Sequence, residues 1–320
     1  IIPVVDGVDF TVRRGQTLGI VGESGSGKSV TTKALMQLLP KTAIISADSS
    51  IRLYRADGEI VEIAQLPPTS RAVRRIRGGD ISMIFQEPMS AFSPVYTVGN
   101  QIVEAIRLHR PVSKRDAREI ALNLLERVGI ANPLQRFHQY PFELSGGMRQ
   151  RALIATALAS NPSLLIADEP TTALDVTIQA QILELMRELQ EEFHMAIIFI
   201  THDLGVISQI AHEVAVMYLG RIMEQGSTNE IIHNSKHPYT QSLLEAIPQL
   251  DNLGMRLQAI RGDIPSPLER PAGCPFHTRC LQAIVNKCDT FVPAKTMLGQ
   301  DHLVQCILFE QSEVIDHAAA

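Results

Sequence analysis

The segment that most constrains this chain is a glycine-rich stretch near its start, with the pattern G-x-x-x-x-G-K-S. An apolar run at 17–21, typical of a buried strand, precedes it, and apolar positions at helical spacing follow it up to Pro40. Glycines let the backbone turn its N–H groups toward phosphate oxygens, and a helix N-terminus adds a positive dipole end. This strand–loop–helix context predicts a phosphate-binding loop formed by Gly22, Glu23, Ser24, Gly25, Ser26, Gly27, Lys28 and Ser29.

Two loop residues and a pair of carboxylates predict a site for a nucleotide and Mg²⁺. We expect Lys28 to reach the β- and γ-phosphates and Ser29 to ligate Mg²⁺. Asp168 and Glu169 follow a second apolar run at 164–167, and a carboxylate at the end of a parallel strand points into the ligand crevice. Asp168 is therefore expected to hold Mg²⁺ and Glu169 to act as general base, although the pair alone equally fits a solvated strand end.

Two further polar residues follow apolar runs. His202 comes after the run at 195–200, where it can bond the γ-phosphate or position the attacking water. Gln86 follows the run at 81–85, and its amide can contact Mg²⁺ and that water. A lone histidine is more often structural, and a single glutamine carries no weight, so both predictions depend on the neighbouring motifs.

Taken together, these motifs resemble the ATP-binding subunit of an ABC transporter. The discriminating segment is 144–150, LSGGMRQ, which is similar to the ABC signature; on its own it also fits a turn that starts a helix over about 146–159. The resemblance implies that ATP is sandwiched between two ATPase domains. In the family, the signature residues contact ATP held by the opposite subunit, which implies this role for Ser145, Gly146 and Gly147. The resemblance also implies that the 173–175 loop, with Asp175, lies at the dimer interface. It further implies that Gln86 is the glutamine of the Q-loop and His202 the switch histidine.

Segments 237–240, 261–267 and 273–280 resemble the C-terminal extension of the dipeptide, oligopeptide and nickel importer branch. This resemblance implies a peripheral subunit at the cytoplasmic face of the cell membrane. Its expected partners are a second ATPase subunit, usually a different paralogue, two transmembrane permease subunits and an extracytoplasmic substrate-binding protein. The cargo is read by those partners, so peptides are favoured only weakly over nickel, opines or oligosaccharides. The family's adenine-stacking aromatic residue is expected upstream of Ile1.

The expected fold is α/β: a phosphate-loop ABC ATPase domain with a parallel sheet core, an antiparallel β layer and a helical subdomain. Strand–helix alternation over 160–226 indicates the parallel sheet, and two short runs around 56–58 indicate a hairpin. Apolar spacing indicates helical structure over 97–147, and the resemblance implies that this region is the helical subdomain, at about 97–160. We expect the ATPase domain at 1–250 and a small cysteine-containing extension at 251–320, where prolines interrupt regular structure.

All four cysteines lie in that extension. Clustered cysteines in a cytosolic chain favour a metal site over disulfides. Structural zinc sites favour cysteine pairs two to four residues apart, a spacing that is missing here. Members of the importer branch with a similar pattern carry an iron–sulfur cluster, so we expect a four-iron four-sulfur cluster, with zinc or free or paired thiols as alternatives, on Cys274, Cys280, Cys288 and Cys306.

Composition, motifs and domain organisation argue against several other classes of protein. No apolar run approaches the roughly 18 residues that cross a bilayer. The net charge of −5 argues against a nucleic-acid surface, and the arginine cluster at 71–77 is expected to be a solvated helix face. A soluble ABC ATPase without a transporter usually carries coiled-coil arms or two fused domains, which this chain lacks. A regulator that binds ATP without hydrolysis is disfavoured because Glu169 and His202 are both present.

Overall fold

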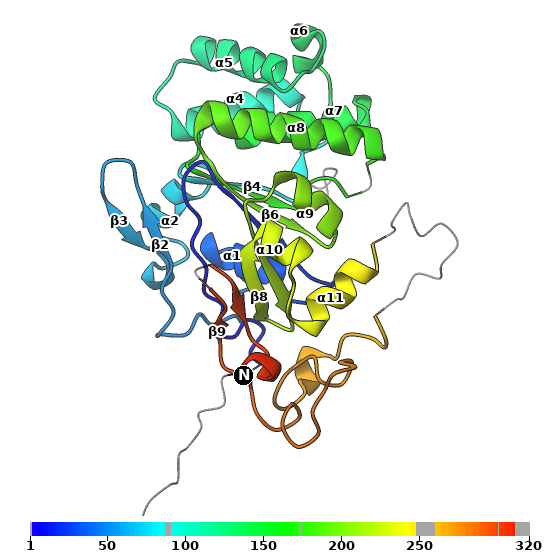
Figure 1. The fold of residues 1–320 in the computed structure, drawn as a ribbon. Helices are drawn as coiled ribbons and strands as arrows, with labels where there is room; N and C mark the ends of the chain where they lie inside the picture. Colours follow the sequence, from blue (N-terminus) through cyan, green and yellow to red (C-terminus); the bar gives the residue numbers. More distant parts are fainter. Residues whose placement is uncertain (1, 87–90, 173, 248–259, 300, 311–320) are drawn as a thin grey trace, which may run out of the picture.

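The computed structural model describes residues 2–86, 91–172, 174–247, 260–299 and 301–310 (Figure 1). Its centre is an eight-stranded sheet with the strand order β4-β5-β6-β1-β7-β8-β10-β9. The strands from β4 to β7 are parallel, whereas β8, β10 and β9 each pair antiparallel to their neighbour. The strand bounds are β1 Thr17–Val21, β4 Ile81–Ile84, β5 Leu164–Asp168, β6 Ala196–Thr201, β7 Glu213–Tyr218, β8 Arg221–Ser227, β9 Thr296–Met297 and β10 Leu303–Val304.

The parallel strands form because their apolar side chains are covered on both faces of the sheet. Every residue of β1 and β6 is buried, as expected for continuous apolar runs. Adjacent strands end in register: Val21 pairs with Thr201, and Asp168 pairs with Ile200. The loops that leave β1, β5 and β6 therefore start at one edge of the sheet, where ligands bind in open α/β sheets.

Helices cover the sheet and build a separate helical layer. Figure 1 shows α4 to α8 gathered on one side, away from α10, α11 and the C-terminal segment. Helical structure over 97–147 is confirmed, with short breaks between helices. The helix bounds are α1 Lys28–Leu35, α2 Arg71–Ile76, α4 Val98–His109, α5 Lys114–Arg127, α6 Pro133–Phe137, α7 Gly146–Ala157, α8 Val176–Phe193, α9 Leu204–Ile210, α10 Thr228–His233 and α11 Pro238–Glu245.

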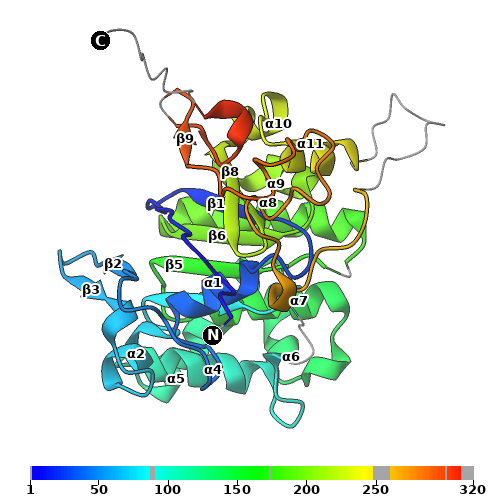
Figure 2. The ribbon, with the colours of Figure 1, turned by 90° about the horizontal axis from the view of Figure 1, so that it is seen from below.

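Short 3₁₀ turns connect several of these elements: η1 Ile63–Gln65, η2 Pro141–Glu143, η4 Pro267–Glu269 and η5 Ile307–Phe309. The predicted hairpin is confirmed as the antiparallel pair β2 Arg52–Tyr54 and β3 Ile60–Glu62. It stands beside α2, apart from the main sheet (Figures 1 and 2). Within the described parts of the chain, no helix combines the length and apolar character needed to cross a membrane.

The first helix ends earlier than its apolar spacing predicted. α1 stops at Leu35, well before Pro40, because Gln37 adopts a left-handed backbone with φ of 54°. The Gln37 side chain donates a hydrogen bond of 2.8 Å to the carbonyl of Ile63, which ties this turn to η1. Leu38 and Leu39 therefore follow the helix instead of extending it, and the expected helix end was wrong.

The arginine cluster is only partly a solvated helix face. Arg71, Arg74 and Arg75 are exposed on α2, as expected. Arg77 lies after the helix, and its guanidinium donates to the backbone carbonyls of Met36, at 2.7 Å, and Gln37. Its role is structural, since carbonyl groups at the end of a helix need donors.

The C-terminal extension is joined to the ATPase sheet. β10 pairs with β8, and Glu224 of β8 is completely buried at this junction. The Glu224 carboxylate accepts hydrogen bonds from the backbone N–H groups of Lys236 and His237 and lies 2.7 Å from Nε2 of His302. A buried carboxylate needs such partners, so Glu224 anchors the start of α11 and the β10 segment on the sheet.

Candidate functional site

The phosphate-binding loop lies between β1 and α1, as predicted. Gly22 has φ of +152°, and a Cβ atom there would lie 2.2 Å from the carbonyl oxygen of Met217. Only glycine can therefore stand at the start of the loop without moving β7. Gly27 precedes α1 in a left-handed conformation, and Ser24 and Gly25 form the exposed tip. The loop backbone is thus held close to the sheet while its tip stays open.

The side chain of Lys28 is almost fully buried and is surrounded by the backbone of the phosphate loop. Its Nζ donates to the carbonyl oxygens of Gly22, at 2.6 Å, and Glu23, at 2.9 Å. Burial lowers the pKa of the Lys28 ammonium, and the nearby charges of Glu169, Asp168 and Glu23 oppose this shift. The negative charge beside it favours a cation, so the loop holds an ammonium group ready for phosphate oxygens.

Ser29 and Asp168 meet from opposite sides of the crevice. The Ser29 hydroxyl donates a 3.0 Å hydrogen bond to Oδ1 of Asp168, at the end of β5. Burial raises the pKa of Asp168, while the bond from Ser29 opposes the shift. A hydroxyl and a carboxylate at this separation are hard oxygen donors of the kind that Mg²⁺ uses beside nucleotide phosphates. These two residues therefore fit a Mg²⁺ ion in chemistry and in placement.

Glu169 forms the centre of a second cluster. Its carboxylate accepts hydrogen bonds of 3.0 Å from Nε2 of Gln86 and from the hydroxyl of Thr172, and it lies 3.6 Å from Nδ1 of His202. Its backbone has φ of 49°, a left-handed conformation that costs a residue with a side chain about 1–2 kcal/mol. Such strain is found where a side chain is held for function. The structure thus brings Gln86, Glu169 and His202 together.

The signature residues lie elsewhere in the chain, at the exposed start of α7. Ser145 caps this helix, and its hydroxyl accepts a 3.4 Å hydrogen bond from the N–H of Met148. Gly146 is exposed, and Gly147 packs toward Ile178 of α8. Asp175 caps α8 by accepting from the N–H of Ile178, whereas the adjoining Ala173 lies outside the described residues. The N-termini of α7 and α8 therefore lie close together.

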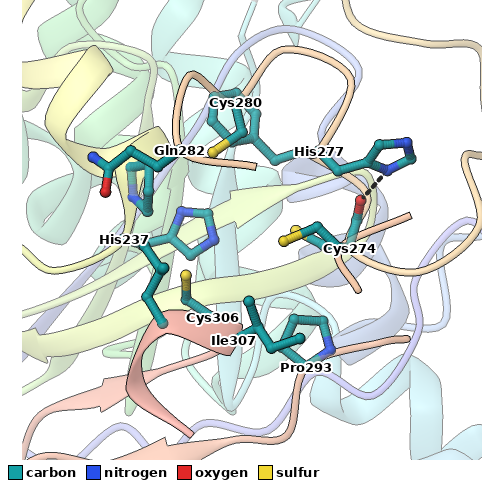
Figure 3. Close-up of a pocket in the computed structure, with 12 residues that line it drawn as sticks. His237, Cys274, His277, Cys280, Gln282, Pro293, Cys306 and Ile307 are labelled. Carbon is teal, nitrogen blue, oxygen red and sulfur yellow. Dashed lines mark hydrogen bonds between the residues drawn. The ribbon is translucent and has the colours of Figure 1, made fainter. Parts of the chain in front are cut away.

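The four cysteines line one small pocket together with His237 (Figure 3). All four are free thiols, and burial raises the pKa of Cys274 to about 12 and that of Cys306 to about 11. Within the described ranges, no group of three or more His, Cys, Asp or Glu side chains is placed so that it could hold a metal ion. The expected iron–sulfur cluster is therefore not supported by the side-chain positions, although the sulfur donors share one space.

His237 adds an unusual polar group to this pocket. Its ring is buried, and Nδ1 accepts a 3.0 Å hydrogen bond from the N–H of Tyr239. Burial lowers the pKa of His237 to about 3, so the ring is neutral and carries its proton on Nε2. That Nε2 atom has no hydrogen-bond partner among the described residues. Buried N–H groups are normally paired, so this donor fits an acceptor held in the pocket.

Sequence reasoning missed two residues at the phosphate loop. Arg279 donates two hydrogen bonds to the carboxylate of Glu23, at 2.7 and 3.0 Å, and Tyr239 accepts one from the N–H of Glu23. Both belong to segments that were identified only by family resemblance. Since Arg279 and Glu23 are 256 residues apart, no spacing in the chain indicates their contact.

The fold and the site define an ATP-binding cassette, and comparison with known proteins gives the same result. Residues 5–172 match the ABC transporter family, and the chain belongs to it. Residues 223–288 match the C-terminal region of oligopeptide/dipeptide transporters, which assigns the chain to that branch of the family. The family and branch expected from the motifs are both confirmed, and the chain is an ABC-type ATPase.

Relatives cover nearly the whole chain. The dipeptide transport ATP-binding protein DppD of Bacillus subtilis is 47% identical over 310 residues, covering 97% of this chain and 90% of that protein. DppD of Escherichia coli is 44% identical over 302 residues, covering 94% and 90%. Among solved structures, a dimeric post-hydrolysis state of the cassette MJ0796 bound to ADP and Pi aligns with a TM-score of 0.59 and 25% identity, covering 70% of this chain and 90% of that one.

Proposed function

We propose that this chain hydrolyses ATP to power the import of dipeptides or oligopeptides through an ABC transporter. The observation that carries the proposal is the meeting of Gln86, Glu169 and His202 beside a phosphate loop that holds Lys28. The oligopeptide/dipeptide C-terminal region supports the cargo class. Residues 1–250 form the ATPase domain in this proposal, and 251–320 form the extension.

The proposed chemistry uses groups that are already in place. Lys28 and the loop N–H groups would bind the phosphates, and Ser29, Asp168 and Gln86 would hold Mg²⁺, which would offset phosphate charge. Glu169 accepts a proton from a water molecule whose oxygen attacks the γ-phosphorus. The bond between that phosphorus and the β–γ bridging oxygen breaks, which gives ADP and phosphate. His202 lies beside Oε1 of Glu169, whereas Gln86 donates to Oε2, and His202 can bond the γ-phosphate from there.

The exposed signature supports a sandwich of two ATPase subunits. Ser145, Gly146 and Gly147 lie at the N-terminus of α7, where Ser145 and Gly146 are exposed, and helix N-termini attract phosphate oxygens. They would contact ATP held by a second ATPase subunit, with Asp175 at the same interface. That second subunit is proposed to be a paralogue.

The helical subdomain offers a surface for two membrane-spanning permease subunits. A groove there is lined by Tyr96, Asn100, Glu104, Arg107 and Leu108, among others. Tyr96 and Leu108 expose 58% and 72% of their surface, which is a large exposure for apolar side chains. In this proposal the chain acts at the cytoplasmic face of the membrane as a peripheral subunit, and an extracytoplasmic substrate-binding protein delivers the cargo.

Co-purification from native membranes tests this proposal. A tagged chain in detergent should retain two multi-span proteins and a second ATPase subunit, identified by mass spectrometry, and a peptide-binding protein should stimulate its ATP hydrolysis. As a control, the same purification is repeated with groove substitutions Tyr96→Asp and Leu108→Asp, which should release the membrane proteins. Hydrolysis without any membrane partner would favour a soluble ABC ATPase instead.

The small pocket lined by the four cysteines and His237, here called the thiol pocket, is proposed to hold a four-iron four-sulfur cluster on Cys274, Cys280, Cys288 and Cys306. Support comes from the chemistry of the donors, since thiolates are the usual ligands of such clusters, and from the unpaired Nε2–H of His237, which suits an acceptor in the pocket. A bound cluster would supply negative sulfur atoms to that donor. The part of the chain around it has little regular structure, so its folding is expected to depend on the bound group.

Anaerobic purification followed by iron and acid-labile sulfide assays tests the cluster. The unaltered chain should be coloured and contain both elements. Cys280→Ser should lose them, whereas Leu281→Ser, a substitution of the exposed neighbour, should keep them. Colourless protein with bound zinc, or without metal, would contradict the cluster.

A further inference from the structure

The C-terminal extension holds the phosphate loop at one residue, Glu23. Arg279 makes a two-bond contact with both carboxylate oxygens of Glu23. The hydroxyl of Tyr239, on α11, accepts a hydrogen bond of 3.0 Å from the Glu23 N–H. The carbonyl of the same residue accepts from Nζ of Lys28. The Glu23 carbonyl also accepts from the N–H of Ser26 at 3.2 Å. Every polar group of Glu23 is therefore engaged, and two of its four partners, Arg279 and Tyr239, lie outside the loop.

Arg279 is itself held firmly. Its side chain is 5% exposed, its Nε donates to the carbonyl of Arg261 at 2.9 Å, and it donates to the hydroxyl of Tyr218 at 3.3 Å. Tyr218 in turn packs edge-on against Tyr239 and Phe276, with ring centroids 4.8 and 5.3 Å apart. A paired, buried guanidinium in a packed aromatic wall has little freedom to move, so it fixes the carboxylate it contacts.

The same short segment lines the thiol pocket. Cys274 and Cys280 lie on either side of Arg279 in the chain, and Phe276 belongs both to the pocket lining and to the aromatic wall. His237 lines the pocket and holds the N–H of Tyr239, which contacts Glu23. The wall between the thiol pocket and the phosphate loop is thus one packed layer.

We propose that Arg279 is a positioning residue for ATP binding, acting through Glu23, and that the extension shapes the phosphate loop in this way. The proposal rests on the ATPase function proposed above. Because Arg279 contacts the phosphate loop at Glu23, whereas the proposed base is Glu169, its loss should affect nucleotide affinity more than the chemical step. If the phosphate loop shifts by about an ångström, its N–H groups no longer align with the phosphate oxygens, and the affinity for the nucleotide falls.

A double-mutant cycle tests this coupling in the full-length chain, with Mg-ATP as the titrant. Arg279→Gln and Glu23→Gln should each raise the Kd and KM for Mg-ATP about tenfold, with kcat within about twofold of the unaltered chain. The double variant should be no weaker than either single variant, since both remove the same contact. Arg279→Lys keeps the positive charge but cannot donate two parallel hydrogen bonds to the carboxylate. Its Kd and KM should therefore lie between those of the unaltered chain and those of Arg279→Gln.

A matched control separates this role from general stability. Lys295 of the extension is exposed and donates to Asp9 and to the carbonyl of Gly7, neither of which belongs to the phosphate loop, so Lys295→Gln should leave Kd and KM unchanged. Thermal unfolding of each variant identifies any that fail to fold, and Arg279→Lys then replaces Arg279→Gln in the cycle. Unchanged affinity in Arg279→Gln, or losses that multiply in the double variant, would overturn the proposal. Absence of Mg-ATP binding by the unaltered chain would instead overturn the ATPase function on which it rests.

Discussion

Replacing Lys28 with alanine is expected to raise the Kd for Mg-ATP by about a hundredfold, because two charge-assisted bonds to phosphate are lost at about 1.5 kcal/mol each. The buried ammonium of Lys28 is the cation at the centre of the loop. Its removal also takes the Lys28 donor from the carbonyls of Gly22 and Glu23, of which Glu23 keeps the bond from the N–H of Ser26. ATP hydrolysis should fall to background for the same reason.

Titration with Mg-ATP by calorimetry measures this effect. Lys41→Ala is the matched control, since Lys41 is an exposed lysine beyond α1, and it should bind Mg-ATP like the unaltered chain. Circular dichroism should confirm that Lys28→Ala keeps its helix content. Tight binding in a folded Lys28→Ala chain would contradict the assigned role of the loop.

Replacing Glu169 with glutamine is expected to reduce the ATP hydrolysis rate by about a hundredfold to a thousandfold, within the range for loss of a general base. Glutamine has the shape of glutamate, so contacts with Gln86 and Thr172 can largely persist. Its amide cannot accept the proton of the attacking water. The affinity for Mg-ATP should therefore stay close to that of the unaltered chain, in contrast to Lys28→Ala.

A rate assay on the purified complex measures this second effect. Glu119→Gln changes an exposed carboxylate on α5 and should leave the rate unchanged. Hydrolysis at an unaltered rate in Glu169→Gln would show that Glu169 is not the general base. His202, which lies beside it, would then be the next candidate.

The sheet and the loops at its edge could be predicted from sequence because the strands are short apolar runs that end in polar motifs. β1, β5 and β6 lie where those runs predicted them, and the two carboxylates at the end of β5 face the loop. The roles of Gln86 and His202 were suggested by their place after apolar runs and by family resemblance. Their contacts with Glu169 are properties of the folded chain that apolar spacing does not contain.

Other features were beyond sequence reasoning for identifiable physical reasons. The end of α1 depends on the left-handed backbone of Gln37 and its bond to η1, so apolar spacing alone predicted a longer helix. β9 and β10 have two residues each, too few for a period of alternation to appear. The clamp of Arg279 on Glu23 joins segments far apart in the chain, and only folding brings them together.

The most direct test of the account is the identity of the nucleotide that Glu169→Gln retains. The purified complex is incubated with Mg-ATP, freed of unbound nucleotide and analysed by chromatography of the extracted nucleotides. We expect trapped ATP with Glu169→Gln, and mainly ADP or no nucleotide with the unaltered chain. Recovery of ADP from Glu169→Gln at the level of the unaltered chain would contradict the claim that this chain hydrolyses ATP through Glu169.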